Sequence, residues 1–306
     1  MISNQVTTII DGDKCIGCGL CITVCPSKTL SLRDGKVMVT GDESIQCGHC
    51  EAICPENAIK VGAIDPSLIC STFEEQSNWL PFGDFDTREL VRLMRSRRSC
   101  RNYSDQVISR DILDDLIKIG ISAPSGSNSQ AWTFTVLPDY NALMSLGKHV
   151  MAYFKSLNRM AENLPLRLLS YIFAHDELGL YYRNYYKKVK EGIEEFEEKG
   201  TDRLFHGAQA AILVGGNKKM SFSPQDDALL ATQNILLAAH SMGLGTCLIG
   251  FAVEAMKRDP SIKKKLSIPE NECIYSVIAF GYPKEKYQRV TGRKPVEIRY
   301  YDNKSS

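Results

Sequence analysis

Two similar cysteine runs near the amino end constrain this chain more than any other feature. Seven of its eleven cysteines fall between residues 15 and 54. CIGCGLCITVCP (15–26) aligns with SIQCGHCEAICP (44–55), so that three cysteines and the closing proline coincide. Only the first ligand position differs, because Ser44 stands where the first run has Cys15. An internal repeat of this kind predicts two structurally equivalent half-units.

The spacing within each run is that of iron–sulfur ligands. A C-x2-C-x2-C run supplies three thiolates to one four-iron cluster, and in two-cluster ferredoxins the last cysteine of each run binds the other cluster. The chain resembles bacterial two-cluster ferredoxins over about its first 60 residues. Two sites follow from this pattern: a complete [4Fe–4S] site of Cys15, Cys18, Cys21 and Cys54, and a second site of Cys25, Cys47 and Cys50 with Ser44 at its fourth corner.

The ligation of the second site stays open at this stage. A serine alkoxide, a water or a hydroxide can bind the fourth iron, or the site can hold a [3Fe–4S] cluster. Our hypothesis is a second four-iron cluster with a non-thiolate ligand at the Ser44 corner. A zinc site, or free cysteines in a core, is the alternative for the whole motif, but it does not explain a two-fold repeat that includes both prolines. His49 occupies a spacer position and is interpreted as a neighbour of the site.

Composition sets the broad class. The chain has 306 residues, 43% of them hydrophobic, and a net charge of +1, which gives no indication of nucleic-acid binding. The first residues lack a basic stretch followed by a long apolar run, and no segment reaches the roughly 18 apolar residues of a membrane span. We therefore expect a soluble, cytoplasmic protein in a reducing compartment, with no membrane partner.

The length allows two domains. We expect an α+β protein with a ferredoxin-type domain over residues 1–65, a linker over 66–86 that contains Pro66, Pro81 and Gly83, and a larger domain over 87–306. Residues 151–205 are helical in propensity, rich in tyrosine and end in a charged run, which predicts a helical insertion. It is either a solvated helix pair or a lid over an active site.

Periodicity predicts the elements of the larger domain. Helices are expected from Thr87, after Ser109, and from Ser223 to about Met242, where Gly243 ends the helix and little polar face remains outside the core. Strands are expected at 131–137, 210–216, 247–251 and 274–280, because these runs are short, apolar and bounded by turn residues. Trp132 is expected in the core.

Four further segments carry a second resemblance. They are the Arg97-Arg98-Ser99 triplet, APSGSNSQAW (123–132), QNILLAAHSMGLGTCLIGF (233–251) and GRKP (292–295). In this order and spacing the chain resembles the nitroreductase family over about residues 87–306. The resemblance implies a mixed sheet with flanking helices, FMN as cofactor, and a homodimer with both flavin sites at the subunit interface.

The resemblance also implies site residues. Guanidinium groups and a hydroxyl suit a flavin phosphate, which assigns Arg97, Arg98, Ser99 and Arg293 to it. Ile249 and Gly250 match the loop whose backbone lies against the flavin ring. A further segment is expected to reach the flavin held by the partner subunit: Pro124, Ser125, Ser127 and Asn128. No side chain stands out as a catalytic acid or base, so none is predicted.

Clusters carry single electrons and a flavin collects two, so their combination predicts an oxidoreductase. We expect electrons to pass from the clusters to FMN and on to a small planar acceptor such as a nitroaromatic, a quinone or an activated alkene. The alternatives are an NAD(P)H-dependent nitroreductase with accessory clusters, and a non-enzymatic electron carrier or redox sensor. A ferredoxin or NAD(P)H is the expected donor, although no Gly-x-Gly-x-x-Gly turn is present.

Overall fold

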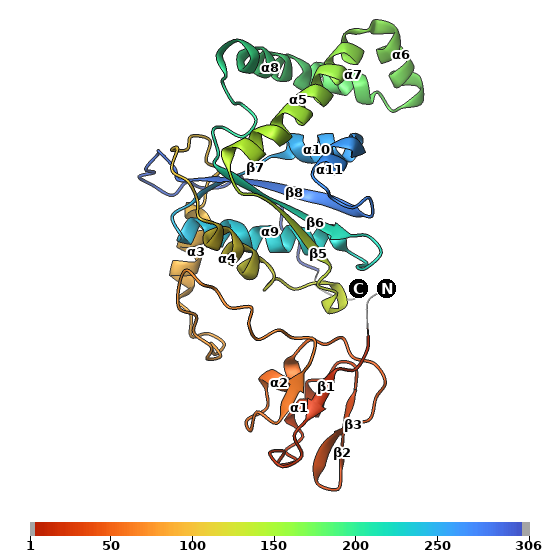
Figure 1. Cartoon of the computed structure of the whole chain (residues 1–306), viewed down its shortest axis with the longest axis vertical. Coiled ribbons are helices and arrows are strands. Elements are labelled where there is room, and N and C mark those ends of the chain that lie inside the picture. The colour runs from red at the N-terminus through yellow and green to blue at the C-terminus, as the bar shows by residue number, and fades with distance from the viewer. Residues whose placement is uncertain (1–3, 302–306) are drawn as a thin grey trace.

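The computed structural model describes residues 4–301, which form an α+β chain with a small amino-terminal part and a larger carboxy-terminal part (Figure 1). This confirms the expected fold class. In the small part, β1 (Thr8–Ile10) pairs with β4 (Ile59–Val61), and β2 (Leu30–Arg33) forms a hairpin with β3 (Lys36–Val39). Asp34 and Gly35 both have positive φ at its tip, as a two-residue hairpin turn requires.

The cysteine repeat is visible in the backbone. The short helices α1 (Leu20–Thr23) and α2 (His49–Ala52) follow Gly19 and Gly48, which have nearly equal φ values of 77° and 75°. Glycine accepts this left-handed conformation without a steric cost. The predicted equivalence of the two half-units is therefore confirmed at the level of backbone conformation.

A four-stranded antiparallel sheet forms the centre of the larger part. Its order is β5 (Trp132–Leu137), β6 (Ala210–Asn217), β8 (Glu272–Gly281), β7 (Gly245–Leu248). Helices α4 (Arg110–Gly120) and α9 (Pro224–Ser241) cover one face, whereas α5 (Tyr140–Glu162) and α10 (Gly250–Arg258) cover the other (Figure 1).

Strand β6 shows why both faces are covered. Its side chains alternate between two cores, since Ile212 and Val214 pack with α4 and α9, while Ala211 and Leu213 pack with α5 and α10. Successive residues of a strand point to opposite faces of the sheet. An uninterrupted apolar strand therefore requires helices on both sides.

Most predicted elements are confirmed. Helix α3 (Thr87–Ser96) begins after Asp86, whose carboxylate accepts a hydrogen bond from Arg88 N–H, and α4 is capped in the same way by Ser109. Gly243 has a φ of 82° and follows α9. Ser223 precedes α9, but its side chain makes no capping hydrogen bond, contrary to the sequence expectation.

Two sequence expectations in this region are wrong in detail. The strand expected at 247–251 is β7 at Gly245–Leu248, because Gly250 already opens α10. Helix α9 also does not lie wholly in the core. Ala231 and Ile235 are fully buried, whereas Leu229 and Leu230 remain 42% and 46% exposed.

The segment 151–205 is helical, as predicted. It comprises the end of α5, then α6 (Leu164–Phe173), α7 (Glu177–Tyr181), the π-helical turn η2 (Tyr182–Tyr186) and α8 (Lys187–Lys199). These helices extend from the side of the sheet opposite the amino-terminal part (Figure 1). The short α11 (Pro260–Lys265) lies beside α10.

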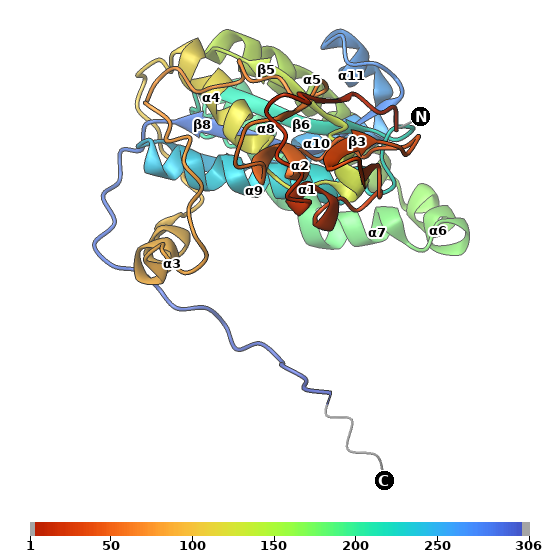
Figure 2. The ribbon, with the colours of Figure 1, turned by 90° about the horizontal axis from the view of Figure 1, so that it is seen from below.

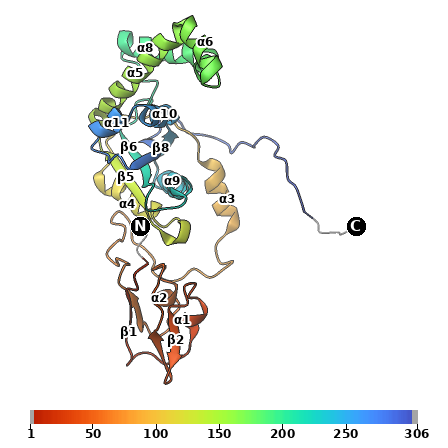
Figure 3. The same ribbon diagram turned by 90° about the vertical axis from the view of Figure 1, so that its right-hand side faces the viewer.

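Two segments stand away from this core. After β8 the chain continues to residue 301 without helix or strand and leaves the body as an extended arm (Figures 2 and 3). Helix α3 lies apart from the sheet in the same views and contacts α9. Both segments expose apolar side chains: Leu90, Val91 and Met94 on α3, and Val296, Ile298, Tyr300 and Tyr301 on the arm.

The linker 66–86 has neither helix nor strand and is fastened to α4. The buried Asp115 carboxylate accepts hydrogen bonds from the backbone N–H groups of Ser71 (2.9 Å) and Thr72 (2.7 Å). Lys118 adds an ion pair to Asp115 at 3.1 Å. Within residues 4–301, no helix is long and apolar enough to cross a membrane.

Candidate functional site

Four thiols line one cavity of the amino-terminal part. Cys15, Cys18, Cys21 and Cys54 surround it together with Val37 and Ile59. Burial raises the pKa of the Cys21 thiol, and the nearby thiols of Cys18 and Cys54 raise it further. The structure therefore brings the last cysteine of the second run to the three leading cysteines of the first.

A second cavity gathers the complementary set. Cys25, Cys47 and Cys50 line it, and Ser44 lines it with them. Burial raises the pKa of Cys50, and Cys25 and Cys47 act in the same direction. The two runs thus exchange their last cysteines, which is the arrangement expected for ligands of two four-iron clusters.

Ser44 occupies the same structural position as Cys15. The Ser44 hydroxyl accepts a hydrogen bond of 3.1 Å from the backbone N–H of Gln46, two residues later. The N–H of Val37 donates to the Cys15 sulfur at 3.4 Å and lowers the pKa of this thiol, and the N–H of Gly17, two residues after Cys15, acts in the same direction. Gln46 has a positive φ of 53°, as Gly17 has at 70°.

The thiols lie around two cavities, as expected for ligands that bind separate irons of a larger inorganic core. His49 is exposed beside the second cavity and remains a neighbour of the site.

The larger part contains a cluster of arginines. Burial lowers the pKa of Arg97, and the positive charges of Arg293 and Arg98 lower it further, so the three guanidinium groups lie near one another. None of the groups that act on Arg97 is a carboxylate. Like charges held together in this way favour an anion.

Two segments that are far apart in the sequence contribute to this cluster. Ser99 forms a parallel bridge with Thr246 of β7, which fixes the end of α3 against the sheet. Arg98 donates a hydrogen bond of 3.0 Å to the Thr291 hydroxyl, next to Gly292 and Arg293. A cavity of about 620 Å³ adjoins the cluster and is lined by basic groups from α3, α9 and the arm: Arg92, Arg95, Arg98, His240 and Arg289.

Arg101 is a charged residue beside the predicted site that the sequence analysis did not single out. Burial raises the pKa of the Cys247 thiol on β7, and the nearby positive charge of Arg101 opposes this shift. Isolated bridges at Ser99 and Tyr103 mark an extended segment. Alternate residues of an extended segment share one face. The spacing of Arg97, Ser99 and Arg101 in the run RRSCR (97–101) is therefore the sequence signal that places Arg101 on the same face as Arg97.

The loop 124–130 lies between the two parts. Pro124 and Ser127 are exposed, and the Ser125 hydroxyl accepts a hydrogen bond from the N–H of Gln130 at 3.0 Å. Asn128 donates from its side-chain amide to the carbonyl oxygens of Ile45 (2.9 Å) and Gln46 (3.1 Å). The side-chain nitrogen of Asn128 therefore forms hydrogen bonds with the amino-terminal part of the chain.

In the loop assigned to the flavin ring, the backbone N–H groups of Ile249 and Gly250 differ in their hydrogen bonding. The N–H of Ile249 donates to the carbonyl of Val277 at 2.9 Å, so this group serves the sheet. Gly250 is the first residue of α10, and N–H groups in the first turn of a helix have no partner within the helix. Of the two residues predicted, Gly250 is therefore better placed to donate to a ring nitrogen.

An aromatic cavity of about 870 Å³ borders this loop. Leu248 and Gly250 line it on one side, and the insertion supplies Tyr181 and Tyr185 on the other. Phe251 contacts Tyr185 edge to face, with ring centroids 6.1 Å apart. The cavity thus lies between the predicted ring loop and the helices that were considered as a lid. Trp132 packs in the core, as expected, and donates to the carbonyl of Asp227 at 3.0 Å.

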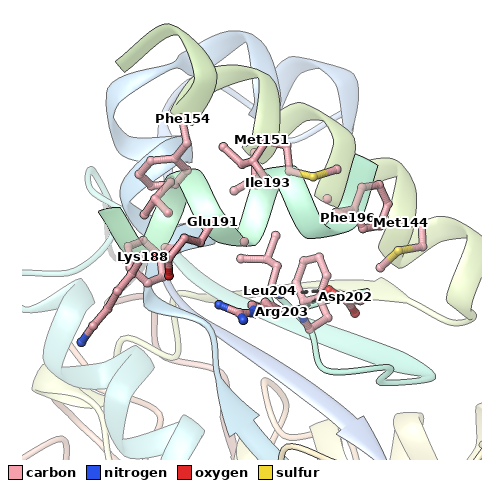
Figure 4. A pocket seen from close by; sticks show the side chains of 16 residues that line it. Met144, Met151, Phe154, Lys188, Glu191, Ile193, Phe196, Asp202, Arg203 and Leu204 are labelled. Carbon is pink, nitrogen blue, oxygen red and sulfur yellow. Dashed lines mark hydrogen bonds between the residues drawn. The ribbon is translucent and has the colours of Figure 1, made fainter. Parts of the chain in front are cut away.

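A second cavity of about 470 Å³ lies between α5 and α8 (Figure 4). Its lining is mainly apolar, with Met144, Met151 and Phe196 among its walls. Two of its four charged lining residues are engaged elsewhere, since Arg203 pairs with Glu195 and Asp202 accepts from backbone N–H groups. Phe154 and Phe251 line both cavities, so the two spaces meet at the start of α10.

Comparisons with known proteins agree with this geometry. Residues 94–282 match the model of the nitroreductase family, and residues 7–55 match a 4Fe-4S dicluster domain. The chain is 28% identical over 202 residues, 65% of this chain and 87% of the relative, to a protein of Archaeoglobus fulgidus assigned as an NADH dehydrogenase/NAD(P)H nitroreductase. It is 26% identical over 223 residues, 67% of this chain and 86% of the relative, to a 4-nitrobenzoate reductase of a Nocardioides species.

A solved structure agrees with the fold. The nitroreductase with bound FMN from Desulfitobacterium hafniense aligns with a TM-score of 0.50 and 22% identity, covering 69% of this chain and 98% of the other. The matched family model spans more than half of the sequence. The chain therefore belongs to the nitroreductase family and carries a 4Fe-4S dicluster domain ahead of that fold.

Proposed function

We propose that this oxidoreductase passes electrons from two iron–sulfur clusters through FMN to a small planar acceptor. The observation that carries the proposal is the exchange of the last cysteines between the two runs, in a chain whose larger part has the nitroreductase fold. One-electron centres linked to a flavin suit a reductase that collects electrons singly and delivers them in pairs.

The cofactor of the larger part is FMN, as in the related structure from Desulfitobacterium hafniense. Arg97, Arg98 and Arg293 hold its phosphate in the arginine cluster, together with the Ser99 hydroxyl. The Gly250 N–H, at the start of α10, would donate to the flavin ring. FMN would supply two-electron reduction chemistry at this site, with protons available from water.

The acceptor binds in the aromatic cavity beside Gly250. Its walls of Tyr181, Tyr185 and Phe251 suit a flat molecule, because aromatic rings stack or pack edge to face with one another. A nitroaromatic fits this description, and the Nocardioides relative is named for its reduction of one. Quinones and activated alkenes share the same shape and electron demand. The insertion 151–205 acts as the lid of this cavity.

The functional unit is a homodimer. Leu229 and Leu230 on α9 are exposed, as are the apolar side chains of α3 and the arm. Exposed apolar side chains gathered on such segments are suited to pack against a second copy. Pro124, Ser125 and Ser127 lie on the loop that we propose reaches the flavin of the partner subunit, whereas the Asn128 amide, also expected there, bonds to Ile45 and Gln46 of its own chain.

Anaerobic stopped-flow mixing tests the reaction. Protein reduced with dithionite is mixed with 4-nitrobenzoate, and the flavin absorbance is followed. We expect rapid reoxidation of the flavin together with loss of the nitro compound. Flavin that stays reduced in the presence of the acceptor contradicts the proposal.

A second candidate is an NAD(P)H-dependent nitroreductase whose clusters are accessory. The assignment of the Archaeoglobus fulgidus relative favours it. Anaerobic titration with NADPH distinguishes the two, because rapid bleaching of the flavin supports direct use of nicotinamide, whereas reduction only by a ferredoxin or dithionite supports the cluster route. A large cavity beside the ring loop argues against a pure electron carrier.

A further inference from the structure

A side-chain amide joins the two parts of the chain at the second cluster site. The two Nδ2 hydrogens of Asn128 are donated to two successive carbonyl oxygens, those of Ile45 at 2.9 Å and Gln46 at 3.1 Å. These two residues lie between Ser44 and Cys47 in the loop that lines the second cavity. The contact therefore holds the ligand loop itself.

The orientation of the Asn128 amide is fixed by its surroundings. The Asn128 carbonyl oxygen accepts a hydrogen bond of 3.0 Å from the side chain of Gln130, so the nitrogen must point toward the ligand loop. Ser127, Asn128 and Gln130 all have positive φ, between 44° and 52°. Non-glycine residues adopt this conformation at a cost, and such costs concentrate at functional positions.

The larger part of the chain anchors this strained loop through a buried carboxylate. The Asp227 carboxylate of α9 is 3% exposed and accepts hydrogen bonds from the Gly126 N–H at 2.9 Å and from the Ser129 hydroxyl at 3.2 Å. The Ser221 hydroxyl donates to the same carboxylate at 2.7 Å. A buried carboxylate with this many donors is a rigid anchor.

The first cavity has a different environment. The hydrogen bonds to its ligands Cys15 and Cys54 come from Val37 and Ala58 of the same amino-terminal part. Cys15 and Cys21 are buried, but Cys18 is exposed, and the adjoining Ile16 is 62% exposed. The first site thus reaches solvent at Cys18, whereas the ligand loop of the second is bonded to the larger part.

We infer that electrons leave the ferredoxin domain through the second, Ser44-containing site, and that Asn128 is the positioning residue that holds this site against the flavin domain. The inference rests on the proposed function and specifies the order of electron transfer, from the first site to the second site and then to the flavin. A reductant reaches the exposed first site, and two successive one-electron transfers through the second site, with one proton from water, reduce the flavin. Dithionite serves as the electron source in the test and is oxidised to sulfite.

The test compares two variants of Asn128 with a matched control in the full, cofactor-loaded chain. Asn128→Asp keeps size and tolerates a positive φ, but it directs a carboxylate at two carbonyl oxygens. Asn128→Gly accepts the same backbone conformation and removes the amide, so it remains informative if the aspartate variant does not fold. Asn271→Asp makes the same chemical change at an exposed turn before β8.

Two readouts are taken for each protein. Stopped-flow absorbance with limiting dithionite separates bleaching of the clusters from reduction of the flavin. Hydrogen–deuterium exchange of residues 44–47 and 126–130 reports the contact without any turnover. We expect cluster bleaching to be unchanged in all variants, and flavin reduction to slow by about tenfold in both Asn128 variants, equivalent to about 1.4 kcal/mol. Exchange of both segments should accelerate in these variants only.

The outcomes separate this inference from the proposed function. Flavin reduction at the wild-type rate in both Asn128 variants overturns the role of Asn128. If the wild-type flavin stays oxidised while the clusters bleach, the proposed function fails, and the inference fails with it.

Discussion

The hydroxyl of Ser44 accepts a hydrogen bond from the backbone N–H of Gln46 at 3.1 Å, and Gln46 has the positive φ that Gly17 has two residues after Cys15. Position 44 therefore retains the geometry of a ligand although the thiol is absent. The presence of serine instead of cysteine changes the chemistry of the ligand but not the conformation of the loop.

Ser44→Cys should complete the second thiolate set. The thiol enters a loop that is already shaped for a ligand, so the variant should retain more iron per chain after exposure to air than the wild type. Ser44→Ala should retain less iron or favour a three-iron cluster. Iron and sulfide analysis with low-temperature spin resonance measures both. Identical cluster content and spectra in all three proteins would show that residue 44 does not face the cluster.

Removal of the arginine cluster should weaken flavin binding. A hydrogen bond to a charged group contributes about 1.5–3 kcal/mol, so Arg97→Ala should raise the dissociation constant of FMN by roughly ten- to a hundredfold. Arg293→Ala should act in the same direction, since it lies beside Arg97. Fluorescence titration of flavin-free protein measures the affinity. Arg110→Ala, at the exposed start of α4, is the control and should leave it unchanged.

Phe251→Ala should impair acceptor binding more than flavin binding. Its ring contacts both Tyr185 and Phe154 and lines both cavities near the ring loop. An aromatic contact contributes about 0.5–1.5 kcal/mol beyond its buried area, so KM for a nitroaromatic should rise several-fold or more. Flavin content and the rate of flavin reduction should not change. Phe173→Ala on α6, where the side chain is 77% exposed, is the control. An unchanged KM in Phe251→Ala would place the acceptor elsewhere.

Asp115 should make stability depend on pH. Burial alone raises the pKa of a carboxyl, but hydrogen bonds from Thr72, Ser71 and Lys118 outweigh it and hold the pKa of Asp115 well below its usual range. A depressed folded-state pKa gives stability that is present above the unfolded value of about 3.9 and is lost as the pH falls through the folded value.

The comparison of Asp115→Asn with the wild type isolates this contribution. Urea unfolding at neutral pH should show a loss of about 1–3 kcal/mol in the variant, because the donors of the linker lose a charged acceptor. The difference should begin to shrink below about pH 4, where the carboxyl of the unfolded chain starts to protonate, and should vanish as the pH falls through the lower pKa of the folded state. Asp114→Asn, one residue away and exposed, is the control. A difference that persists undiminished in acid would mean that the Asp115 charge has no part in fastening the linker.

Local sequence patterns predicted most of the fold. The cysteine repeat determines its own geometry, since Gly19 and Gly48 share one conformation, and the caps Asp86 and Ser109 start the expected helices. The sequence-based predictions that proved wrong were those that depend on tertiary packing. Leu229 and Leu230 have the apolar character of core residues but face outward from α9, and no local signal distinguishes an exposed interface from a buried face.

The candidate site was predicted in its parts but not in their connections. The exchange of Cys25 and Cys54 between cavities was expected from spacing. Two features were not: the contact between Asn128 and the loop of Gln46, 82 residues apart, and the approach of the Arg101 charge to Cys247. Contacts between residues so distant in sequence arise from the packed fold, and one sequence carries no pattern that reveals them.

The central claim is that the clusters reduce the flavin, and a chain with a disabled second site tests it most directly. Cys47→Ala combined with Cys50→Ala removes two of its thiols, and FMN content is verified before use. Both proteins are mixed anaerobically with limiting dithionite, and the order of bleaching is recorded. We predict that in the wild type the clusters bleach first and the flavin follows, whereas the flavin of the variant is reduced much more slowly. Flavin reduction at equal rates in the two proteins would contradict the account.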